Sequence, residues 1–290
     1  MEQKVFRTTR ILTALTLAAL LTMMAAPLSA EDKGSTEAKP TGEAAVAVLS
    51  QYIWRGYEMS RHSVVLQPSM TVGYRDFTAN VWGNLDTRPY YAGTLSDKSY
   101  SSAWNETDVT LSYAKDLGPV TLGGGYIYYG LGALNADAAK RMDAQELFVS
   151  LGLNTILAPT LTVYKEIDHY RNWYFLLGLS HTFTLGKAVS LKLSATASYL
   201  LSTDETTYPR FDGNALATTE KFNNFHDGNI TASLPIMVTD AISLTPTISC
   251  VFPLSGDARD EMKGFGLSGA VPSDRNGTFV FGGLVASLRF

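Results

Sequence analysis

Charged residues are scarce in this sequence, and cysteine is nearly absent. Asp, Glu, Lys and Arg make up 17% of the 290 residues, against about 25% in a typical soluble domain. The single cysteine, Cys250, excludes an internal disulfide. No spacing typical of zinc, haem or iron–sulfur sites occurs, so we expect no metal and no cofactor. The net charge of −4 gives no reason to expect nucleic-acid binding.

Long apolar runs are also missing beyond the N-terminus, which excludes a transmembrane helix there. The N-terminus itself has a basic head (Lys4, Arg7 and Arg10), an apolar stretch over 11–26 and the small residue Ala30. This order predicts a secretory signal peptide over 1–30. The alternative is an uncleaved anchor, but the run is short for a spanning helix. A flexible polar leader over 31–42 and a single domain over 43–290 are expected to follow.

What the sequence does have is two-residue alternation over segments of about ten residues, clearest at 63–74, 189–199 and 242–252. One face of each segment is apolar, and the other carries mostly Ser, Thr and Gly. A soluble β-sandwich would also alternate, but its polar face meets bulk water and usually carries Lys and Glu. Small polar residues instead favour a narrow lumen, and this segment length lets a tilted strand cross a membrane.

About twelve such segments occur, beginning near residues 44, 63, 77, 105, 118, 144, 159, 172, 187, 226, 240 and 277. Tight links alternate along the chain with outward links, which are long and polar except near 57–62 and 168–171. We therefore predict an all-β fold: a transmembrane antiparallel β-barrel of about 12 strands with short periplasmic turns and longer extracellular loops. Its place is the bacterial outer membrane.

Aromatic residues fall where such a barrel meets the two membrane interfaces. The expected outer girdle contains Trp54, Trp104 and Trp173, and the expected inner girdle contains Tyr74, Phe77 and Tyr113. Lys165 falls on an apolar face, so either a bulge turns it inward or its side chain snorkels to the interface.

Phe290 is the last residue and follows alternating apolar residues. This ending resembles the assembly signal of outer-membrane barrels. We therefore expect Phe290 to engage the barrel-assembly machinery, and we expect outer-membrane lipid and lipopolysaccharide to surround the folded protein.

Residues 50–86 carry a more specific pattern. Residues 52–56 read Tyr-Ile-Trp-Arg-Gly, residues 66–69 read Leu-Gln-Pro-Ser, and residues 80–84 read Asn-Val-Trp-Gly-Asn. This resembles the TorF-like family of outer-membrane porins, which open with a Tyr-x-aromatic-Arg-Gly strand and carry a Gln-Pro pair in the next. The resemblance implies an outer-membrane barrel with a channel role. It implies no particular solute and no binding residues.

Arg55 is expected to face the lumen, because Trp54 is expected to face lipid and adjacent strand residues point to opposite faces. An Arg in a narrow pore needs carboxylate partners. The candidate lumen or constriction residues are Arg55, Asp86, Glu106, Asp108, Glu146, Glu166, Asp168 and Lys192. They fit a charged constriction that selects solutes, and equally an ion-pair cluster that fills the barrel. Their acidic excess predicts a weak preference for cations.

Signals for enzymatic chemistry are weak. Asp168 and His169 would point apart in a regular strand, and His62, His181 and His226 have no serine or carboxylate at a telling spacing. Residues 264–269 match a dinucleotide fingerprint by letters but lack its strand and helix context. The acids of the same segment (Asp257, Asp260 and Glu261) fit a solvated loop better than a cation site.

The sequence is therefore interpreted as a non-enzymatic, porin-like channel for the passive diffusion of small hydrophilic solutes. The first alternative is a structural or adhesive barrel whose lumen is plugged. A barrel enzyme, such as a protease or lipase, is the second.

Overall fold

The computed structural model describes residues 38–60, 63–89, 102–131, 143–265 and 277–290. The predicted signal peptide and most of the predicted leader lie outside this part of the chain. From Lys39 onward the chain forms one unit.

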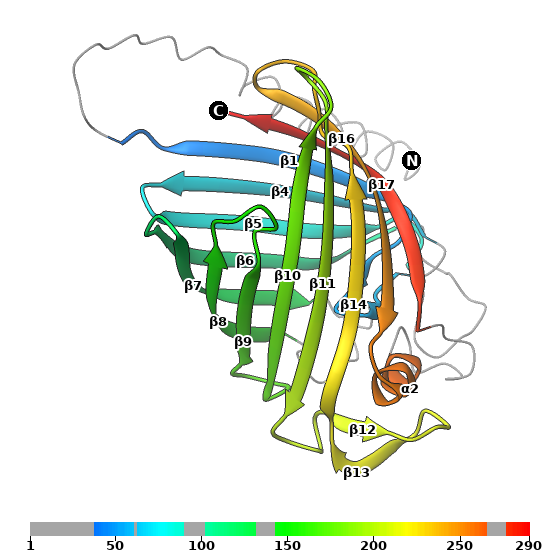
Figure 1. Cartoon of the computed structure of the whole chain (residues 1–290). Coiled ribbons are helices and arrows are strands. Elements are labelled where there is room, and N and C mark those ends of the chain that lie inside the picture. The colour runs from blue at the N-terminus through cyan, green and yellow to red at the C-terminus, as the bar shows by residue number, and fades with distance from the viewer. Residues whose placement is uncertain (1–37, 61–62, 90–101, 132–142, 266–276) are drawn as a thin grey trace, which may run out of the picture. The chain divides into compact units, whose positions relative to one another are not determined.

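Within the described residues, twelve long antiparallel strands close into a barrel (Figure 1). They are β1 (Thr41–Leu49), β4 (Val65–Tyr74), β5 (Phe77–Asp86), β6 (Ala103–Asp116), β7 (Val120–Leu131), β8 (Ala144–Leu153), β9 (Thr160–Glu166), β10 (Asn172–Thr184), β11 (Ser190–Ser202), β14 (Asn223–Ser233), β16 (Ile242–Pro253) and β17 (Phe279–Arg289). Each strand pairs with the next of these along the chain, and β17 pairs with β1 to complete the ring. The two-residue strand β15 (Ile236–Met237) pairs with β16 beside the main ladder. The predicted fold class and strand number are confirmed.

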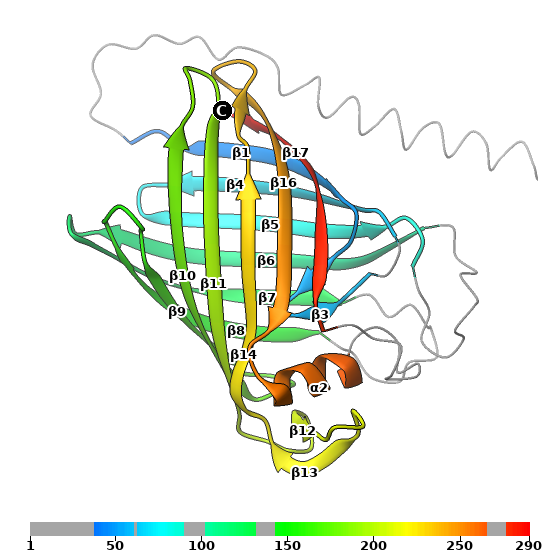
Figure 2. The ribbon, with the colours of Figure 1, turned by 45° about the vertical axis from the view of Figure 1, so that its right-hand side comes forward.

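The two ends of the barrel differ in the length of their links. Links such as 75–76 and 117–119 are short, whereas the opposite end carries longer segments. One of these contains the hairpin β12 (Pro209–Phe211) and β13 (Ala217–Lys221), and another contains helix α2 (Gly256–Phe265). Figures 1 and 2 show both at the same end of the barrel. Since barrels of this class place their long loops outside, we call this the outer end.

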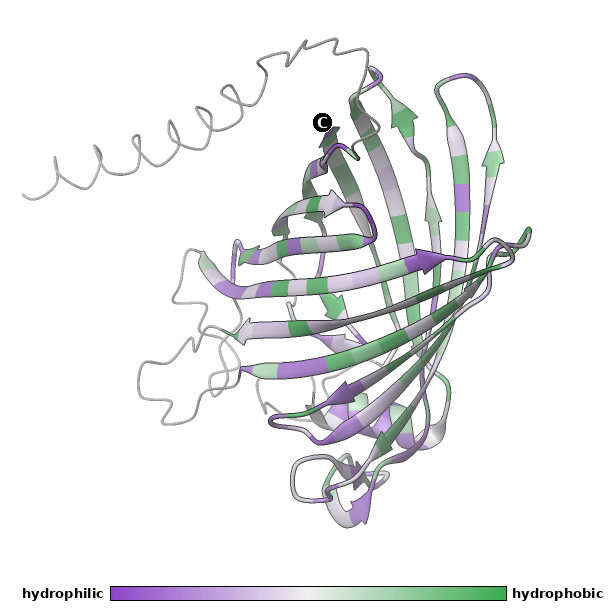
Figure 3. Cartoon of the chain, turned by 90° about the vertical axis from the view of Figure 1, so that its left-hand side faces the viewer, coloured by the Kyte–Doolittle hydropathy of each residue, from purple (hydrophilic) through white to green (hydrophobic). Residues whose placement is uncertain are grey.

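The outer surface of the strands is apolar, and the inner surface carries mainly small polar residues. Val149 on β8 is 62% exposed and Val280 on β17 is 65% exposed, while residues such as Ser194 and Thr231 pair across the inner face. Figure 3 shows hydrophobic and hydrophilic residues alternating along the strands. A closed sheet with an apolar outer surface belongs in lipid. The protein is therefore an outer-membrane β-barrel.

No helix among the described residues is long and apolar enough to cross a membrane.

Lys165 stays on the outer surface, where it is paired in register with Trp173. Its ammonium nitrogen lies 5.0 Å from the centroid of the Trp173 ring. Lys165 is next to the outer end of β9, so its charge can reach the interface while its stem lies on apolar surface. Of the two readings of this residue, snorkelling fits the structure and an inward-turning bulge does not.

Phe290 closes the ring beside the start of β1. Gly42 N donates to Phe290 O at 2.7 Å, and Phe290 N donates to Gly42 O at 3.0 Å. The Phe290 ring lies over Gly42, where any side chain on residue 42 would collide with it. The terminal aromatic therefore covers a glycine at the seam where β1 meets β17.

Candidate functional site

The outer half of the lumen is crossed by a small hairpin that sequence analysis assigned to the first strand. β1 ends at Leu49, and the chain then folds into β2 (Ile53–Trp54) and β3 (Tyr57–Glu58). The two turn residues between them, Arg55 and Gly56, have φ angles of 46° and 82°. Positive φ at both central residues is the mark of a type I′ turn, which favours Gly and Asn and costs a bulkier residue about 1–3 kcal/mol. Arg55 therefore needs strong compensating contacts.

Those contacts come from the barrel wall. Arg55 Nη1 and Nη2 donate to Glu146 Oε1 and Oε2 on β8, each at 2.7 Å. Tyr129 on β7 donates to the same carboxylate at 2.9 Å. The Arg55 guanidinium also lies 4.7 Å from the ring centroid of Tyr164 and 4.2 Å from that of Tyr174. A bidentate pair of this kind is directional, so the hairpin tip is fixed at one place in the lumen.

This arrangement corrects the predicted place of Trp54. Its ring lies 5.8 Å from that of Tyr129, on the inner face of β7, and the Arg55 guanidinium covers it at 4.7 Å. Trp54 therefore belongs to the lumen and not to the outer girdle. The prediction failed because the turn reverses the chain, so the two-residue alternation of β1 does not continue past Leu49. Trp104 and Trp173 do face outward, as expected.

The base of the hairpin, like its tip, makes specific contacts. Tyr52 N donates to Ser60 Oγ at 2.7 Å, and the Tyr52 ring lies 5.5 Å from Trp82 on the inner face of β5. Gln51 Nε2 donates to Glu58 Oε1 at 2.6 Å. Hydrogen bonds within the hairpin and ring contacts to the wall thus give it a defined shape.

A buried polar network fastens the hairpin to helix α2, and His226 on β14 is its centre. His226 Nδ1 lies 2.9 Å from Asp227 Oδ1, and its Nε2 lies 2.6 Å from Glu261 Oε2 on α2. Tyr57 on β3 donates to Glu261 Oε1 at 2.9 Å. Glu261 and His226 are fully buried. The network thus ties a loop hairpin, a loop helix and the barrel wall together.

The structure corrects two expectations here. His226 does have carboxylate companions, and Glu261 belongs to a helix and is buried rather than solvated. The cause is a shift in the register of β11 against β14 between Ala197 and Tyr199. At this irregularity the neighbours His226 and Asp227 are both buried, which regular alternation forbids. Burial raises the pKa of the Glu261 carboxyl above its ordinary value, although His226 opposes that shift.

The other carboxylates of the predicted set lie along the outer half of the inner face or at its rim, and most are already engaged. Asp86 accepts hydrogen bonds from Ser63 and from the Arg88 amide. Glu106 is buried and lies close to Tyr52.

Asp108 is two residues further along β6. Its Oδ1 is buried with no hydrogen-bond partner among the described residues. Lys192 lies on the inner face near the short-turn end, paired in register with Thr182 and Ser233.

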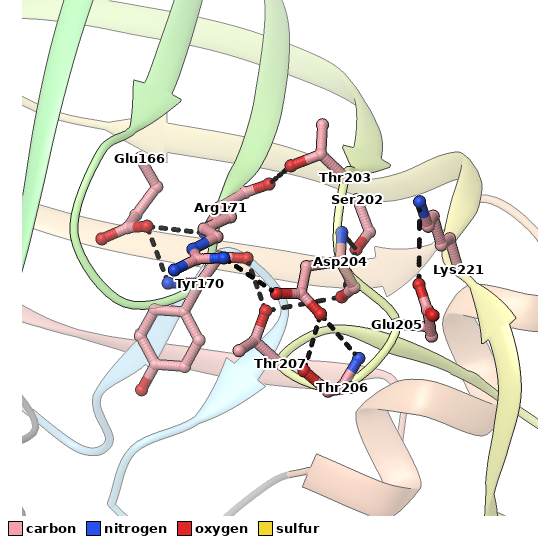
Figure 4. A network of polar contacts seen from close by, with 10 residues as sticks. All are labelled: Glu166, Tyr170, Arg171, Ser202, Thr203, Asp204, Glu205, Thr206, Thr207 and Lys221. Atoms are coloured by element: carbon pink, nitrogen blue, oxygen red, sulfur yellow. Dashed lines mark hydrogen bonds and ion pairs between the residues drawn. The ribbon is translucent and has the colours of Figure 1, made fainter.

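Glu166 stabilises a turn at the outer rim of the barrel and does not line an open pore. Its carboxylate accepts the backbone amides of residues 168–171, at 3.0, 2.7, 2.7 and 2.7 Å. Figure 4 shows this turn beside the loop after β11, where Arg171 faces Asp204 at 3.4 Å. Asp168, in the same turn, accepts Gln145 Nε2 at 3.0 Å. Its neighbour His169 donates its backbone amide to Glu166, and within the described residues no hydrogen bond or ion pair joins the Asp168 and His169 side chains.

An aromatic cluster completes the outer end. It consists of Tyr57, Tyr174, Leu200, Tyr208, Phe222, Ala258 and Met262, drawn from the hairpin, the wall, the 203–222 link and α2. Gly56 packs against Met262, and a Cβ on residue 56 would collide with Met262 Cε, so the end of that side chain would have to shift. Protein side chains thus pack across part of the outer half of the lumen.

Below the hairpin tip lies a cavity of 230 Å³. Its wall includes Arg55 and Tyr174 from the site just described, together with Thr196, Asp227 and Asn229. A larger cavity, of 490 Å³, lies at the short-turn end, between Glu43, Lys187 and Arg289. Both are bordered by the small polar residues of the inner face.

No protein-family model and no curated protein matches the chain. Solved structures are similar to it in fold. The NanC porin is 11% identical with a TM-score of 0.49, covering 85% of this chain and 98% of its own. An outer-membrane channel from Pseudomonas putida F1 is 11% identical with a TM-score of 0.45, covering 91% and 100%. LpxR from Salmonella typhimurium is 8% identical with a TM-score of 0.45, covering 86% and 99%.

Proposed function

We propose that this outer-membrane barrel is a porin-like channel for the passive diffusion of small hydrophilic solutes, and that the β2–β3 hairpin forms its constriction. The observation that carries the proposal is Arg55, held across the lumen by Glu146 on β8. A charged residue held across a polar lumen can select solutes by their charge. The lumen toward the short-turn end, lined by small polar residues, offers solutes a hydrated path.

Two further parts of the proposal rest on the sequence. One is kinship with the TorF-like porins, supported by the residues of the hairpin and the two following strands. The other is a weak cation preference, supported by the acids of the inner face, of which Glu106 and Asp108 form no ion pair with a described basic residue.

A plugged structural barrel is the second candidate, and the aromatic cluster at the outer end favours it. The cluster, the His226 network and the Arg55–Glu146 pair together hold the hairpin in the lumen and α2 against it at the outer end. A barrel enzyme has less support, because Ser198 donates to Asp227 and not to His226.

Recordings from purified protein in planar lipid bilayers separate these candidates. We expect discrete conductance steps from the wild type, and larger steps when residues 51–60 are replaced by a short Gly-Ser linker. A silent wild type with a conducting linker variant would establish the plugged barrel. Silence of both, with normal heat-modifiable mobility showing that they are folded, would overturn the channel.

A further inference from the structure

The cavity below the hairpin tip has polar groups that the protein leaves available. Asp227 Oδ1 is saturated, because Tyr174, Ser198 and His226 all contact it, at 2.7, 2.7 and 2.9 Å. Among the described residues, Asp227 Oδ2 has no hydrogen-bond partner and is not sealed off from solvent. The carboxylate is thus held rigidly by one oxygen and presents the other at the cavity wall.

Two neighbours add to this polar wall. Thr196 on β11 and Asn229 on β14 are paired in register, and both line the cavity. Asn229 Oδ1 accepts Thr231 Oγ1 at 3.2 Å, which leaves its amide nitrogen as a donor. Within the described part of the chain, neither that nitrogen nor the Thr196 hydroxyl has a protein partner. A carboxylate oxygen, an amide donor and a hydroxyl therefore stand side by side.

The positive charge at the cavity wall, on Arg55, is already neutralised. Arg55 forms its bidentate pair with Glu146, and its guanidinium covers the Tyr164 and Tyr174 rings. An anionic ligand would have to compete with Glu146 for Arg55, and a cationic one would find those two ring faces occupied by a cation. Phe281 on β17 also lines the cavity, and no described guanidinium or ammonium covers its ring. The cavity thus pairs one apolar ring with a row of neutral and acceptor groups.

We propose that this cavity is a solute subsite for a neutral polyol of monosaccharide size. Hydroxyls of the ligand would donate to Asp227 Oδ2 and accept from Asn229, while its C–H face would contact Phe281. A volume of 230 Å³, below the about 300–1,000 Å³ of sites for drug-sized ligands, admits one small molecule. The inference deepens the channel proposed above and rests on it for the route by which the solute arrives.

The test uses D-glucose and D-mannitol as probes, with L-lysine and L-glutamate as charged comparisons of similar size. In planar bilayers, we expect the two polyols to interrupt the potassium current of the full-length protein with saturable affinity. Asn229→Leu and Thr196→Val should each weaken the block about threefold to tenfold, as expected for one lost hydrogen bond. The matched control is Thr182→Val on the inner face of β10, which does not line the cavity and should leave the block unchanged.

Isothermal titration of D-glucose into the detergent-solubilised protein gives a second readout that needs no current. A conducting protein in which polyols neither block nor bind would overturn the subsite and leave the channel standing. Binding that is weakened by Asn229→Leu in a protein that never conducts would uphold the subsite and overturn the channel. Tighter binding of L-lysine or L-glutamate than of both polyols would refute the proposed ligand class.

Discussion

Arg55 at the tip of the β2–β3 hairpin and Glu146 on β8, 91 residues further along the chain, are joined by two hydrogen bonds of 2.7 Å each. Glu146 is 2% exposed and the Arg55 side chain 12%. A pair buried to this extent contributes little net free energy, but removing one partner leaves an uncompensated charge. The pair therefore holds the hairpin in position and adds little to the net free energy of folding.

Replacing Arg55 by Ala tests this role. The change frees the Glu146 carboxylate, so we expect a larger single-channel conductance and a stronger cation preference. The free energy of unfolding should fall by about 3–5 kcal/mol, because a buried charge loses its partner. Arg55→Lys keeps the charge and loses the bidentate geometry. Its conductance, cation preference and free energy of unfolding should therefore lie between those of the wild type and Arg55→Ala. Increased anion preference in Arg55→Ala would contradict the assignment.

Gly56 offers an independent test of the hairpin. Its φ is 82°, and a side chain there would meet Met262 of α2. Gly118, in a short turn, has a φ of 87° with open space around it. Gly118→Ala should therefore cost only the conformational strain, about 1–2 kcal/mol. Gly56→Ala should cost about 1–3 kcal/mol more from overpacking and should raise conductance. Equal effects on unfolding would show that α2 does not pack on the hairpin in solution.

The docking of α2 should depend on pH through Glu261. Its pKa in the folded protein lies above the ordinary 4.5, because burial disfavours the charged form. The stability that this group contributes is then complete below its ordinary pKa and is lost as pH rises through the raised value. We expect weaker hydrogen-exchange protection of α2 amides at pH 8 than at pH 4, after correction for intrinsic rates. Glu261→Gln, which is always neutral, should reduce that difference.

Most of the barrel was predictable from sequence, because each strand repeats one simple physical pattern. A strand between lipid and a polar lumen must alternate, and this alternation correctly predicts that β8 begins at Ala144. A tight turn also marks the start of β5 at Phe77. The same alternation predicts that three glutamates point inward. In the structure Glu106, Glu146 and Glu166 do face the lumen or its rim.

The candidate site was less predictable, because its geometry comes from departures from that pattern. The Arg55–Gly56 turn lacks the Asn or Asp that usually marks a two-residue hairpin, and Trp54 is as compatible with an interface girdle as with a buried cluster. The pairing of His226 with Glu261 depends on a register shift and on a helix in a long loop. Gly56, in a turn flanked by the aromatic residues Trp54 and Tyr57, is the one local signal of a reversal there.

Phe290 is expected to matter more for assembly than for packing. Its side chain is 56% exposed in the isolated chain, so deletion of the residue removes little buried area. If the terminal aromatic is the assembly signal, deletion should strongly reduce the amount of folded protein in the outer membrane. Phe183→Ala removes an aromatic of similar exposure, 44%, from the middle of the chain and should assemble normally. Equal outer-membrane yields, judged by heat-modifiable mobility, would overturn the prediction.

Ion selectivity should rest on two acids in particular. Glu146 is neutralised by Arg55 and Glu166 is held by backbone amides, so neither adds much to the field in the pore. Glu106 and Asp108 lie on the inner face of β6, and neither forms an ion pair with a described basic residue. Because charges in a confined lumen are poorly screened, any charge on these two carboxyls should attract cations.

The wild type should therefore be weakly cation-selective, and the double variant Glu106→Gln, Asp108→Asn should lose most of that preference. The measurement is the reversal potential across a potassium chloride gradient. Asp76→Asn serves as the control, because Asp76 lies in an exposed short turn and is paired with Lys115 outside the lumen. If the double variant and Asp76→Asn shift the reversal potential equally, selectivity is set by charge at the mouths of the barrel and not by its inner face. Anion selectivity of the wild type would rule out the cation preference altogether, since the described inner face of the outer half carries more acids than bases.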